Sequence, residues 1–345
     1  MDLYVTLIGT AASVPTAARG TAATLISRGG ERWLIDCGEG TQRQLLRSGL
    51  GLIDLDLLLI THLHGDHYLG LPGILKTYGL RGRERPLRLV GPRGLAQLMT
   101  MLRPVVGRTP FPLEIEEVDE RRGGEVWAGD GATVEAFPVR HSVPAVGYAL
   151  VEGSRPGAFD VDAARALGVP SGPLFGRLQR GEAVEAADGA TVRPEQVMGT
   201  PRPGRTVVVT GDTEPCATTL EIATGASVLV HEATFLDADR DRARETRHTT
   251  AREAAALGRG ADVGLLVLTH ISSRNHPREV REEAEREFAR VVVPRDFDQV
   301  EVPFPERGAP VVHTARERRA RAEAAPAEGP DAPSEAPASV SGHDL

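Results

Sequence analysis

The sequence predicts an α/β fold in which two sheets pack face to face and helices lie on the outside. Stretches typical of strands and helices alternate along most of the 345 residues, and the second half repeats the style of the first. Continuous apolar strands such as TVVVT (206–210) and GLLVLT (264–269) indicate sheets that are covered on both faces. Two halves of this kind favour two sheets packed against each other.

Strands are predicted where β-branched, aromatic and leucine residues run between turn-forming residues. In chain order they cover 3–9, 22–27, 32–37, 55–61, 86–90, 113–118, 132–139, 145–152, 205–213, 226–234 and 263–270. Helices are predicted over 40–49, which ends at Gly49, and over 68–79, 249–260 and 277–290.

Two stretches interrupt this alternation. Residues 153–200 are rich in glycine and proline and hold one helical piece, DVDAARALG, so we expect a functional projection rather than a packed element. Residues 315–345 are low in apolar bulk and rich in Ala, Pro, Glu and Ser, which predicts a disordered tail. One folded domain over 1–314, including the projection, is therefore expected before the tail.

Composition points to an ordinary globular protein. Apolar residues make up 41% and charged residues 26%, and no apolar run approaches the roughly 20 residues of a membrane helix. Cys37 and Cys216 provide neither a disulfide framework nor a cysteine-rich metal site, and the N-terminus lacks a signal-peptide pattern, so we expect a cytoplasmic location and no membrane. The net charge of −8 argues against a general nucleic-acid binder but leaves room for a local basic face.

The motif THLHGDH (61–67) follows a buried apolar strand and is the strongest signal in the chain. His62 and His64 are two residues apart in an extended segment, so their side chains project to the same side. Asp66 and His67 follow directly after Gly65. Imidazole and carboxylate groups gathered in this way are ligands for zinc or a similar divalent ion. The other interpretation is a polar turn that caps a helix, but three of the ten histidines lie within the six residues from His62 to His67.

Three further candidate ligands each end an apolar strand. His141 follows VEAFPVR, Asp212 follows TVVVTG, and His270 follows GLLVLT. Because the carboxyl ends of sheet strands converge on one rim, we expect these side chains to join the histidine motif. Two metal ions about 3.5–4 Å apart, bridged by a carboxylate, form a centre suited to hydrolysis.

THLHGDH with downstream His141, Asp212 and His270 resembles the metallo-β-lactamase superfamily, whose fold is a four-layer αβ/βα sandwich with a metal centre at the sheet edge. The resemblance implies a catalytic domain of this fold over 1–314. It also implies that His62, His64 and His141 hold one metal ion, that Asp66, His67 and His270 hold the other, and that Asp212 bridges the two. Two divalent ions per chain are thus expected; zinc is the first choice, and manganese stays open.

Further motifs resemble the ribonuclease Z family of tRNA 3′-processing endonucleases. They are DCGEGTQRQL (36–45), HEATF (231–235), RHTTA (247–251), THISSRN (269–275) and the projection over 155–182. The projection is similar to the tRNA-binding arm of that family, with Gly172 and Pro173 at its glycine–proline turn. The resemblance covers about residues 1–312. It departs at Gly20, where the family often has Asn, which leaves the role of that loop open.

The resemblance implies removal of the 3′ trailer from precursor tRNA, leaving a 3′-hydroxyl on the tRNA and a 5′-phosphate on the trailer. Asp66 would both bind metal and accept the proton of the attacking water, and His248, oriented by Glu232, would protonate the leaving oxygen. The arm would bind tRNA, and the family is commonly a homodimer. Arg155, Arg165, Arg177 and Arg180 are either phosphate contacts or solvated arm charges.

Two alternatives remain open from the sequence. A metal-dependent small-molecule hydrolase of the same fold, such as an arylsulfatase, would share the metal ligands. A metal-binding RNA module without catalysis is the second, although Asp66, His248 and Glu232 speak against it because a binder needs neither base nor acid. Asp36 is interpreted as a turn-stabilising carboxylate near the ligands, and Cys37 as a small buried residue.

Overall fold

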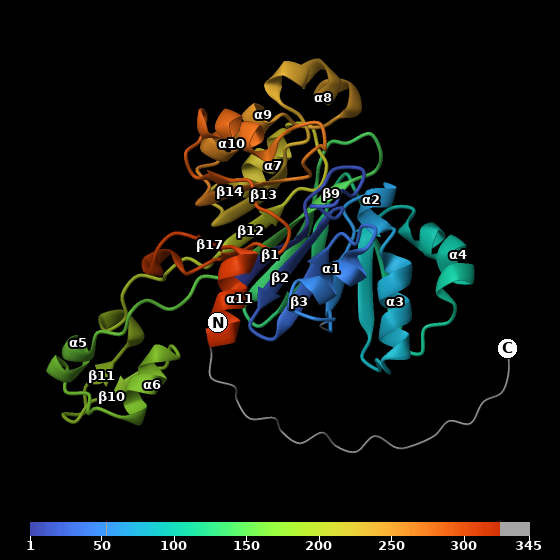
Figure 1. Cartoon of the computed structure of the whole chain (residues 1–345). Coiled ribbons are helices and arrows are strands. Elements are labelled where there is room, and N and C mark those ends of the chain that lie inside the picture. The colour runs from blue at the N-terminus through green and yellow to red at the C-terminus, as the bar shows by residue number, and fades with distance from the viewer. Residues whose placement is uncertain (53, 325–345) are drawn as a thin grey trace.

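The computed structural model describes residues 1–52 and 54–324. Two sheets lie face to face and helices cover both outer faces, so the body has four layers in the order helix, sheet, sheet, helix (Figure 1). This confirms the predicted α/β architecture. In the part of the chain that the structure describes, no helix has both the length and the apolar character that a membrane span requires.

The first sheet has eight strands in the spatial order β17-β16-β1-β2-β3-β4-β5-β6. Their bounds in chain order are β1 Leu3–Gly9, β2 Ala23–Arg28, β3 Glu31–Ile35, β4 Leu57–Leu59, β5 Leu87–Pro92, β6 Leu113–Val118, β16 Gln299–Glu301 and β17 Val311–His313. Strands β3 to β6 run parallel, whereas β1, β2, β16 and β17 pair antiparallel. The parallel part includes β4, which leads into the histidine motif.

The second sheet has seven strands in the order β15-β14-β13-β12-β9-β8-β7. Their bounds are β7 Gly124–Gly129, β8 Ala132–Pro138, β9 Val146–Glu152, β12 Thr206–Val209, β13 Val228–Glu232, β14 Leu265–Thr269 and β15 Val291–Val292. Strands β12 to β15 are parallel, and consecutive pairs from β7 to β12 along this order are antiparallel. The carboxyl ends of β12, β13 and β14 therefore meet at one edge.

Helices complete the outer layers. The first sheet is covered by α1 Thr41–Arg47, α3 Leu71–Leu80 and α4 Leu95–Val106, and the second by α7 Ala217–Ala223, α9 Ala251–Gly260 and α10 Pro277–Glu285. Two short helices, α2 Gly65–Tyr68 and α8 Arg240–Thr246, lie in the loops at the edge where the functional motifs gather. Short 3-10 turns occupy Asp237–Asp239 and Pro305–Arg307.

The central core lies between the two sheets and consists of buried apolar side chains from both. Trp33 of β3 and Trp127 of β7 contact each other across the sheets, with ring centroids 4.9 Å apart. Burial of such large aromatic side chains is a major stabilising contribution, since each removes a large apolar area from water. This double-sided burial explains the continuous apolar strands in the sequence.

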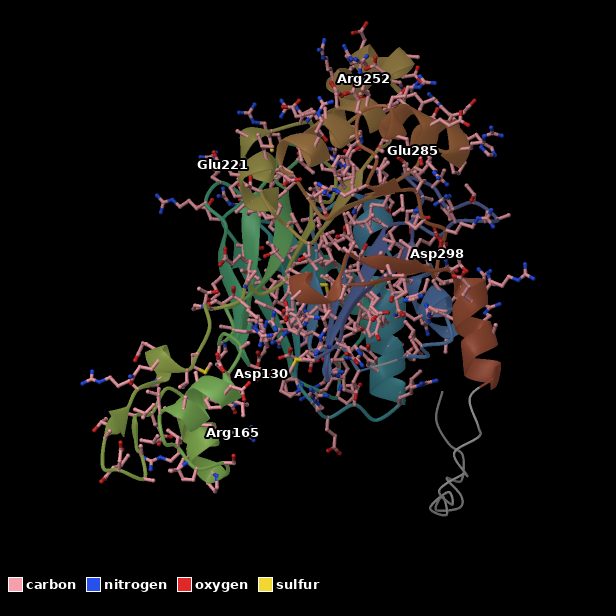
Figure 2. All side chains as sticks on the ribbon, turned by 90° about the vertical axis from the view of Figure 1, so that its left-hand side faces the viewer. Asp130, Arg165, Glu221, Arg252, Glu285 and Asp298 are labelled. Atoms are coloured by element: carbon pink, nitrogen blue, oxygen red, sulfur yellow. The ribbon has the colours of Figure 1, made fainter. Side chains whose placement is uncertain are left out.

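The projection over 153–200 extends away from the body as an arm (Figures 1 and 2). It holds α5 Val161–Ala166, α6 Pro173–Gln179, β10 Val184–Glu185, β11 Thr191–Val192 and a 3-10 turn over Pro194–Gln196. Gly172, with φ of 138°, precedes Pro173 at the start of α6. A small apolar cluster that includes Leu178, Val184 and Val192 holds these pieces together, so the arm has more regular structure than the one helical piece that was predicted.

The prediction of a disordered tail from Ala315 is wrong at its beginning, because helix α11 covers Ala315–Ala324. The Thr314 hydroxyl accepts a hydrogen bond from the backbone N–H of Glu317, whose carboxylate accepts from Thr314 in return. The Arg318 guanidinium donates to the carbonyl of Phe297 at 2.8 Å. Capping and tethering thus supply what the helix lacks in apolar surface. The rest of the predicted tail lies outside the described residues.

Candidate metal centre

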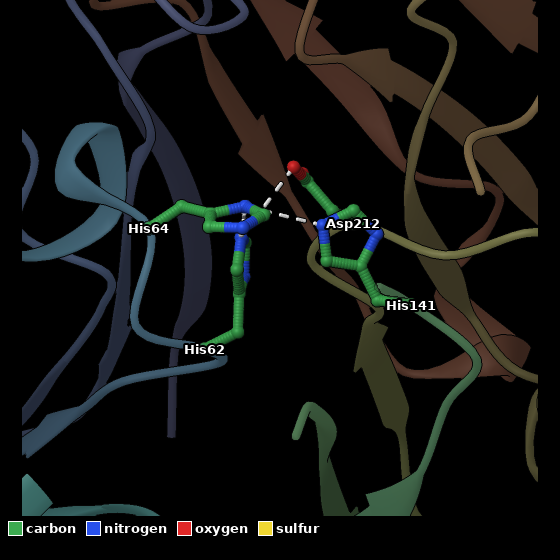
Figure 3. Close-up of side chains that lie close together, drawn as sticks. All are labelled: His62, His64, His141 and Asp212. Carbon is green, nitrogen blue, oxygen red and sulfur yellow. Dashed lines mark hydrogen bonds and ion pairs between the residues drawn. The ribbon is translucent and has the colours of Figure 1, made fainter. Parts of the chain in front are cut away.

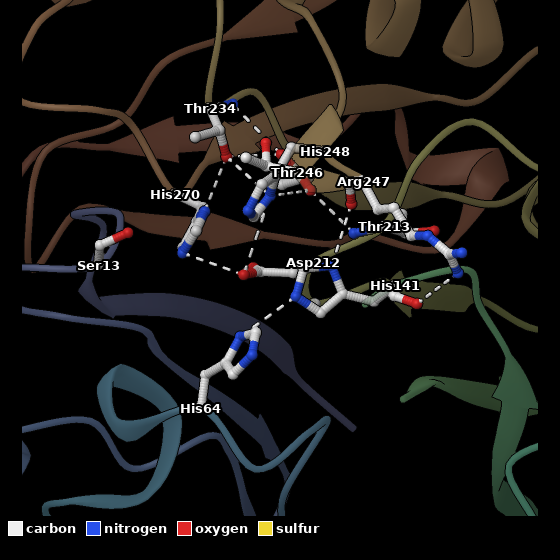
Figure 4. A network of polar contacts seen from close by, with 12 residues as sticks. Ser13, His64, His141, Asp212, Thr213, Thr234, Thr246, Arg247, His248 and His270 are labelled. Atoms are coloured by element: carbon white, nitrogen blue, oxygen red, sulfur yellow. Dashed lines mark hydrogen bonds and ion pairs between the residues drawn. The ribbon is translucent and has the colours of Figure 1, made fainter. Parts of the chain in front are cut away.

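All seven predicted metal ligands lie close together at the edge where the two sheets present their strand ends. Figures 3 and 4 label five of them, His62, His64, His141, Asp212 and His270. They come from the loop after β4, from α2 and from the ends of β8, β12 and β14, and they are His62, His64, Asp66, His67, His141, Asp212 and His270. Residues that are more than 200 positions apart in sequence therefore share one site.

The first group joins His62, His64, His141 and Asp212 (Figure 3). Nδ1 of His64 lies 3.1 Å from Nε2 of His62 and 3.2 Å from Nε2 of His141. Oδ2 of Asp212 lies 3.6 Å from Nε2 of His62. Three imidazoles and one carboxylate thus converge at distances that suit donors around one ion.

The second group joins Asp66, His67 and His270. Oδ2 of Asp66 lies 3.5 Å from Nε2 of His67 and 3.3 Å from Nε2 of His270. Oδ2 of Asp212 lies 3.5 Å and 3.4 Å from the same two nitrogens. The Asp212 carboxylate therefore faces both groups, which is the position of a bridging ligand.

Four of the histidines are held from behind through their other ring nitrogen, the usual arrangement for metal-binding histidines. The contacts are His62 Nδ1 to Thr61 Oγ1 (3.1 Å), His67 Nδ1 to Asp36 Oδ2 (2.7 Å), His141 Nδ1 to the Arg247 carbonyl (3.0 Å) and His270 Nδ1 to Thr234 Oγ1 (2.8 Å). Each contact leaves Nε2 directed at the centre. Asp36 lies behind His67 and also accepts from the Thr61 N–H, in agreement with its interpretation as a supporting carboxylate.

The charges of the cluster fit a bound cation. Among the described residues, Nε2 of His67 and Oδ1 of Asp212 are buried without a hydrogen-bond partner. Burial and neighbouring histidines hold the pKa of His62 well below its ordinary value, which keeps this ring neutral as a ligand requires. Burial lowers the pKa of His67, but the carboxylates of Asp212 and Asp36 raise it well above its ordinary value. Such surroundings favour positive charge between these groups.

A glycine sets the position of Asp212. Gly211 has φ of 64°, and a Cβ atom there would lie 2.7 Å from the side chain of Thr61. Both the left-handed backbone and the close approach require glycine. Thr61 in turn donates to Asp36, so this contact connects the Asp212 loop to the support of His67.

His248 lies beside the cluster (Figure 4) and forms an ion pair with Glu232. Nδ1 of His248 lies 2.7 Å from Oε1 of Glu232 and 4.0 Å from Oδ2 of Asp212. Burial lowers the pKa of His248, but the charge of Glu232 outweighs this effect and raises it to about 9. Glu232 is buried and also accepts from the Thr213 N–H and the Thr234 hydroxyl, so its carboxylate is fixed in place.

A pocket of about 300 Å³ opens next to His248. Arg242 and Arg274 line it together with Ser13, Thr246 and Ser273. Positive guanidinium groups beside a candidate proton donor suit a polyanionic substrate.

The arm residues singled out from the sequence lie away from this centre. Gly172 and Pro173 start α6, and Arg177 at its end pairs with Glu182 at 2.8 Å. Arg165 is exposed (Figure 2), whereas Arg155 lies at the base of the arm and pairs with Glu306 at 2.9 Å. The structure thus separates Arg155 from the outer arm charges.

Three residues that support the centre were not identified from the sequence: Thr61, which contacts Nδ1 of His62 at 3.1 Å, Thr234 and Arg247. Thr234 donates to Glu232 and lies 2.8 Å from Nδ1 of His270, and Arg247 contacts His141 through both its carbonyl and its guanidinium. Thr234 and Arg247 lie within the motifs HEATF and RHTTA. The sequence marks Thr234 only by its place two residues after Glu232, and it gives no such signal for Arg247.

Comparisons with known proteins agree with this geometry. Residues 17–222 match the metallo-β-lactamase superfamily. Ribonuclease Z of Haloferax volcanii is 47% identical over 308 residues, which cover 88% of this chain and 96% of the relative. Ribonuclease Z of Myxococcus xanthus is 46% identical over 306 residues, 88% of this chain and 98% of the relative.

A solved structure extends the comparison to three dimensions. The short form of human tRNase Z superposes with a TM-score of 0.63 at 26% identity, covering 87% of this chain and 99% of that one. The four-layer sandwich with its cluster of histidine and aspartate side chains thus has the metallo-β-lactamase fold, and the two relatives align with it over nearly their whole length. The chain belongs to the ribonuclease Z family of the metallo-β-lactamase superfamily.

Proposed function

We propose that this protein is the endoribonuclease that removes the 3′ trailer from precursor tRNA, leaving a 3′-hydroxyl on the tRNA and a 5′-phosphate on the trailer. The observation that carries this proposal is the His248–Glu232 pair beside the ligand cluster: Glu232 contacts Nδ1 of His248 at 2.7 Å, which leaves Nε2 of the same ring to donate a proton. A proton donor beside a clustered ligand set meets the needs of phosphodiester cleavage. The arylsulfatase-like alternative is not favoured, because curated relatives at 41–47% identity are named Ribonuclease Z.

We infer two divalent metal ions, with zinc as the expected element. His62, His64 and His141 would hold one, Asp66, His67 and His270 the other, and Asp212 both. When bound, such ions lower the pKa of water and stabilise negative charge on a phosphoryl group. Nε2 of His67 and Oδ1 of Asp212, which are buried without a hydrogen-bond partner, support this inference.

The protein's own side chains would move the protons. Asp66, whose Oδ2 accepts from the Ser13 N–H at 2.9 Å, is positioned to take the proton of the attacking water. As the new P–O bond forms, the bond between phosphorus and the 3′ oxygen of the tRNA breaks. His248 then supplies the proton that this oxygen needs to leave as a hydroxyl.

The arm is the proposed tRNA-binding element. Arg165, Arg177 and Arg180 are exposed on it, with side-chain exposures of 61%, 47% and 64%. Guanidinium groups on a protruding element suit phosphate contacts along an RNA backbone. We also propose that the protein is a cytoplasmic homodimer, in which the arm of one subunit serves the active site of the other.

The decisive test is incubation with a 3′-extended tRNA precursor, with and without a chelator, followed by mapping of both new ends. A cut at the base of the trailer with 3′-hydroxyl and 5′-phosphate ends, abolished by the chelator, is expected. Hydrolysis of bis-p-nitrophenyl phosphate without any cleavage of the precursor would instead indicate a small-molecule hydrolase.

A further inference from the structure

The base of the arm consists of two chain segments that pair with each other. Arg155, close to the start of the arm, and Arg202, just after its end, exchange two backbone hydrogen bonds of 2.8 Å each. Two residues separate Arg155 from the end of β9, and three separate Arg202 from the start of β12. These two segments are the covalent connection between the arm and the body.

A third segment of the chain holds this paired base. Glu306 pairs with Arg155 at 2.9 Å and with Arg202 at 3.3 Å, so one carboxylate contacts both segments. The guanidinium of Arg155 lies over the ring of Phe304, 3.4 Å from its centroid. Stacking and ion pairing by the same arginine fix its orientation more than either contact alone.

Phe304 also connects the base to the interior of the body. The guanidinium of Arg205 lies 4.0 Å from its ring centroid, so the ring is contacted by both Arg155 and Arg205. Arg205 is 1% exposed, pairs with Glu152 at 2.7 Å and donates to the Val302 carbonyl at 2.9 Å. The contacts of Arg205 are therefore buried in the body, whereas the ion pairs of Glu306 with Arg155 and Arg202 are partly exposed.

We propose that Phe304 and Glu306, with Arg155 and Arg202, form a clamp that sets the direction in which the arm leaves the body and thereby positions bound tRNA at the metal centre. The four residues are called the base clamp below. This inference rests on the proposed function, because it assigns a role in tRNA presentation. It makes Arg155 a positioning residue rather than a phosphate contact.

The contacts of Arg155 favour this assignment. Its Nη2 atom already donates to Glu306 and to the Pro203 carbonyl, and its side chain is 24% exposed, compared with 61% for Arg165. An arm that is attached by two chain segments and free to pivot would lose orientational entropy each time it binds tRNA in the productive position. A fixed direction removes that cost before binding, so the clamp is expected to act on substrate affinity rather than on the chemical step.

The test variants are Glu306→Gln and Phe304→Leu, with Glu282→Gln as the matched control. Glu282 pairs with Arg278 on α10 at 2.6 Å, and its substitution removes the same charge far from the arm. For precursor tRNA, each clamp variant should raise KM about tenfold while kcat stays within about twofold. Hydrolysis of bis-p-nitrophenyl phosphate should stay at the wild-type rate, and backbone amides over 153–157 and 200–204 should exchange hydrogen faster.

A third variant separates failure of the clamp from failure of the proposed function. Replacing residues 154–203 by a short Gly-Ser linker removes the arm but leaves the metal ligands. Wild-type KM in both clamp variants, together with weak tRNA binding in the arm deletion, would overturn the clamp and leave the function intact. Unchanged tRNA binding in the deletion would instead refute the arm as the tRNA-binding element. Glu306→Asp should restore part of the affinity, which loss of folding would not permit.

Discussion

His141 and Arg247 contact each other through two hydrogen bonds beside the candidate metal centre. Nδ1 of His141 donates to the carbonyl of Arg247 at 3.0 Å, and the guanidinium of Arg247 donates to the carbonyl of His141 at 3.0 Å. Arg247 has φ of 55° and directly precedes His248. One residue thus orients a candidate metal ligand and sets the start of the segment that carries the candidate acid.

Arg247→Ala should weaken metal binding. His141 would keep its hydrogen bond to the carbonyl of residue 247 but would lose the hydrogen bond from the Arg247 guanidinium. Loss of the partner of a ligand's ring nitrogen reduces metal affinity by about 10–100-fold, and because that partner, the carbonyl of residue 247, stays in this variant, we expect a loss of up to about tenfold. Metal content after dialysis against a graded chelator series measures the effect. Arg244→Ala, on an exposed position of α8, is the control and should retain the wild-type content. Equal retention in both variants would show that the guanidinium contact does not support the ligand.

Gly211→Ala should disturb the centre more than its backbone strain alone explains. The new Cβ would lie 2.7 Å from Thr61, whose hydroxyl contacts Asp36. Gly225→Ala is the matched control, since Gly225 has φ of 70° and an added Cβ meets nothing within 4 Å. Both variants should lose about 1 kcal/mol of unfolding free energy from the left-handed backbone. Only Gly211→Ala should also lose metal and activity, so similar metal content in the two would contradict this account.

Much of the site was predictable because its ligands follow strand ends. Asp212 and His270 follow β12 and β14 of the parallel part of the sheet. His141 follows β8, which points the same way as β12 because β9 between them is antiparallel to both, so all three strand ends meet at one edge. Which ring nitrogen faces the centre was not predictable, since it depends on side-chain rotamers: His64 presents Nδ1, whereas His62 and His141 present Nε2. Their roles as metal ligands stay predictions.

The elements that sequence reasoning missed have weak local signals. Helix α4 contains Pro104, which disfavours a helix interior, and β7 begins and ends with glycine. Tertiary contacts decide both: α4 buries Leu95, Leu98 and Met99 against the first sheet, and β7 pairs with β8. A tertiary contact also stabilises helix α11, since Arg318 donates to the carbonyl of Phe297. Composition does not reveal this contact, so the helix was not predicted.

His248→Ala should slow the chemical step on precursor tRNA by about 10²–10⁴-fold, the usual contribution of a positioned general acid. Metal content should stay normal, and the loss should be small for bis-p-nitrophenyl phosphate, whose leaving group needs no proton. His313→Ala removes a histidine that pairs with Glu301 at 2.8 Å outside the centre, and it should leave single-turnover rates unchanged. An equal loss on both substrates would mean that His248 does not protonate the leaving oxygen.

The pH profile gives an independent test of the same acid. Burial lowers the pKa of His248 but Glu232 raises it to about 9, and the protonated form is the active one. Single-turnover rates on precursor tRNA should therefore fall as the pH rises above about 9. In Glu232→Gln this fall should begin at lower pH, because the charge that raises the pKa is gone. A high-pH limb that does not move in Glu232→Gln would assign it to another group.

Glu152→Gln should destabilise the protein at neutral pH, because Arg205 and Arg28 would keep their buried charges without a carboxylate between them. Breaking such a buried pair costs roughly 3–5 kcal/mol. Burial raises the pKa of Glu152, but hydrogen bonds and charges from Arg205 and Arg28 lower it by more than burial raises it. The pKa of Glu152 in the folded protein therefore lies below the ordinary value. A carboxylate whose pKa is lowered in the folded protein contributes its full stabilisation at pH values above its pKa in the unfolded chain, about 4.3. This stabilisation is lost as the pH falls through the pKa of the folded protein.

The difference in unfolding free energy between wild type and Glu152→Gln should therefore be largest at neutral pH and shrink as the pH falls below about 4. Urea unfolding at a series of pH values measures it. Glu282→Gln, which removes a carboxylate from an exposed pair on α10, should differ from the wild type by less than about 1 kcal/mol throughout. A constant gap for Glu152→Gln at every pH would mean that lost packing, and not the carboxylate charge between Arg28 and Arg205, accounts for the destabilisation.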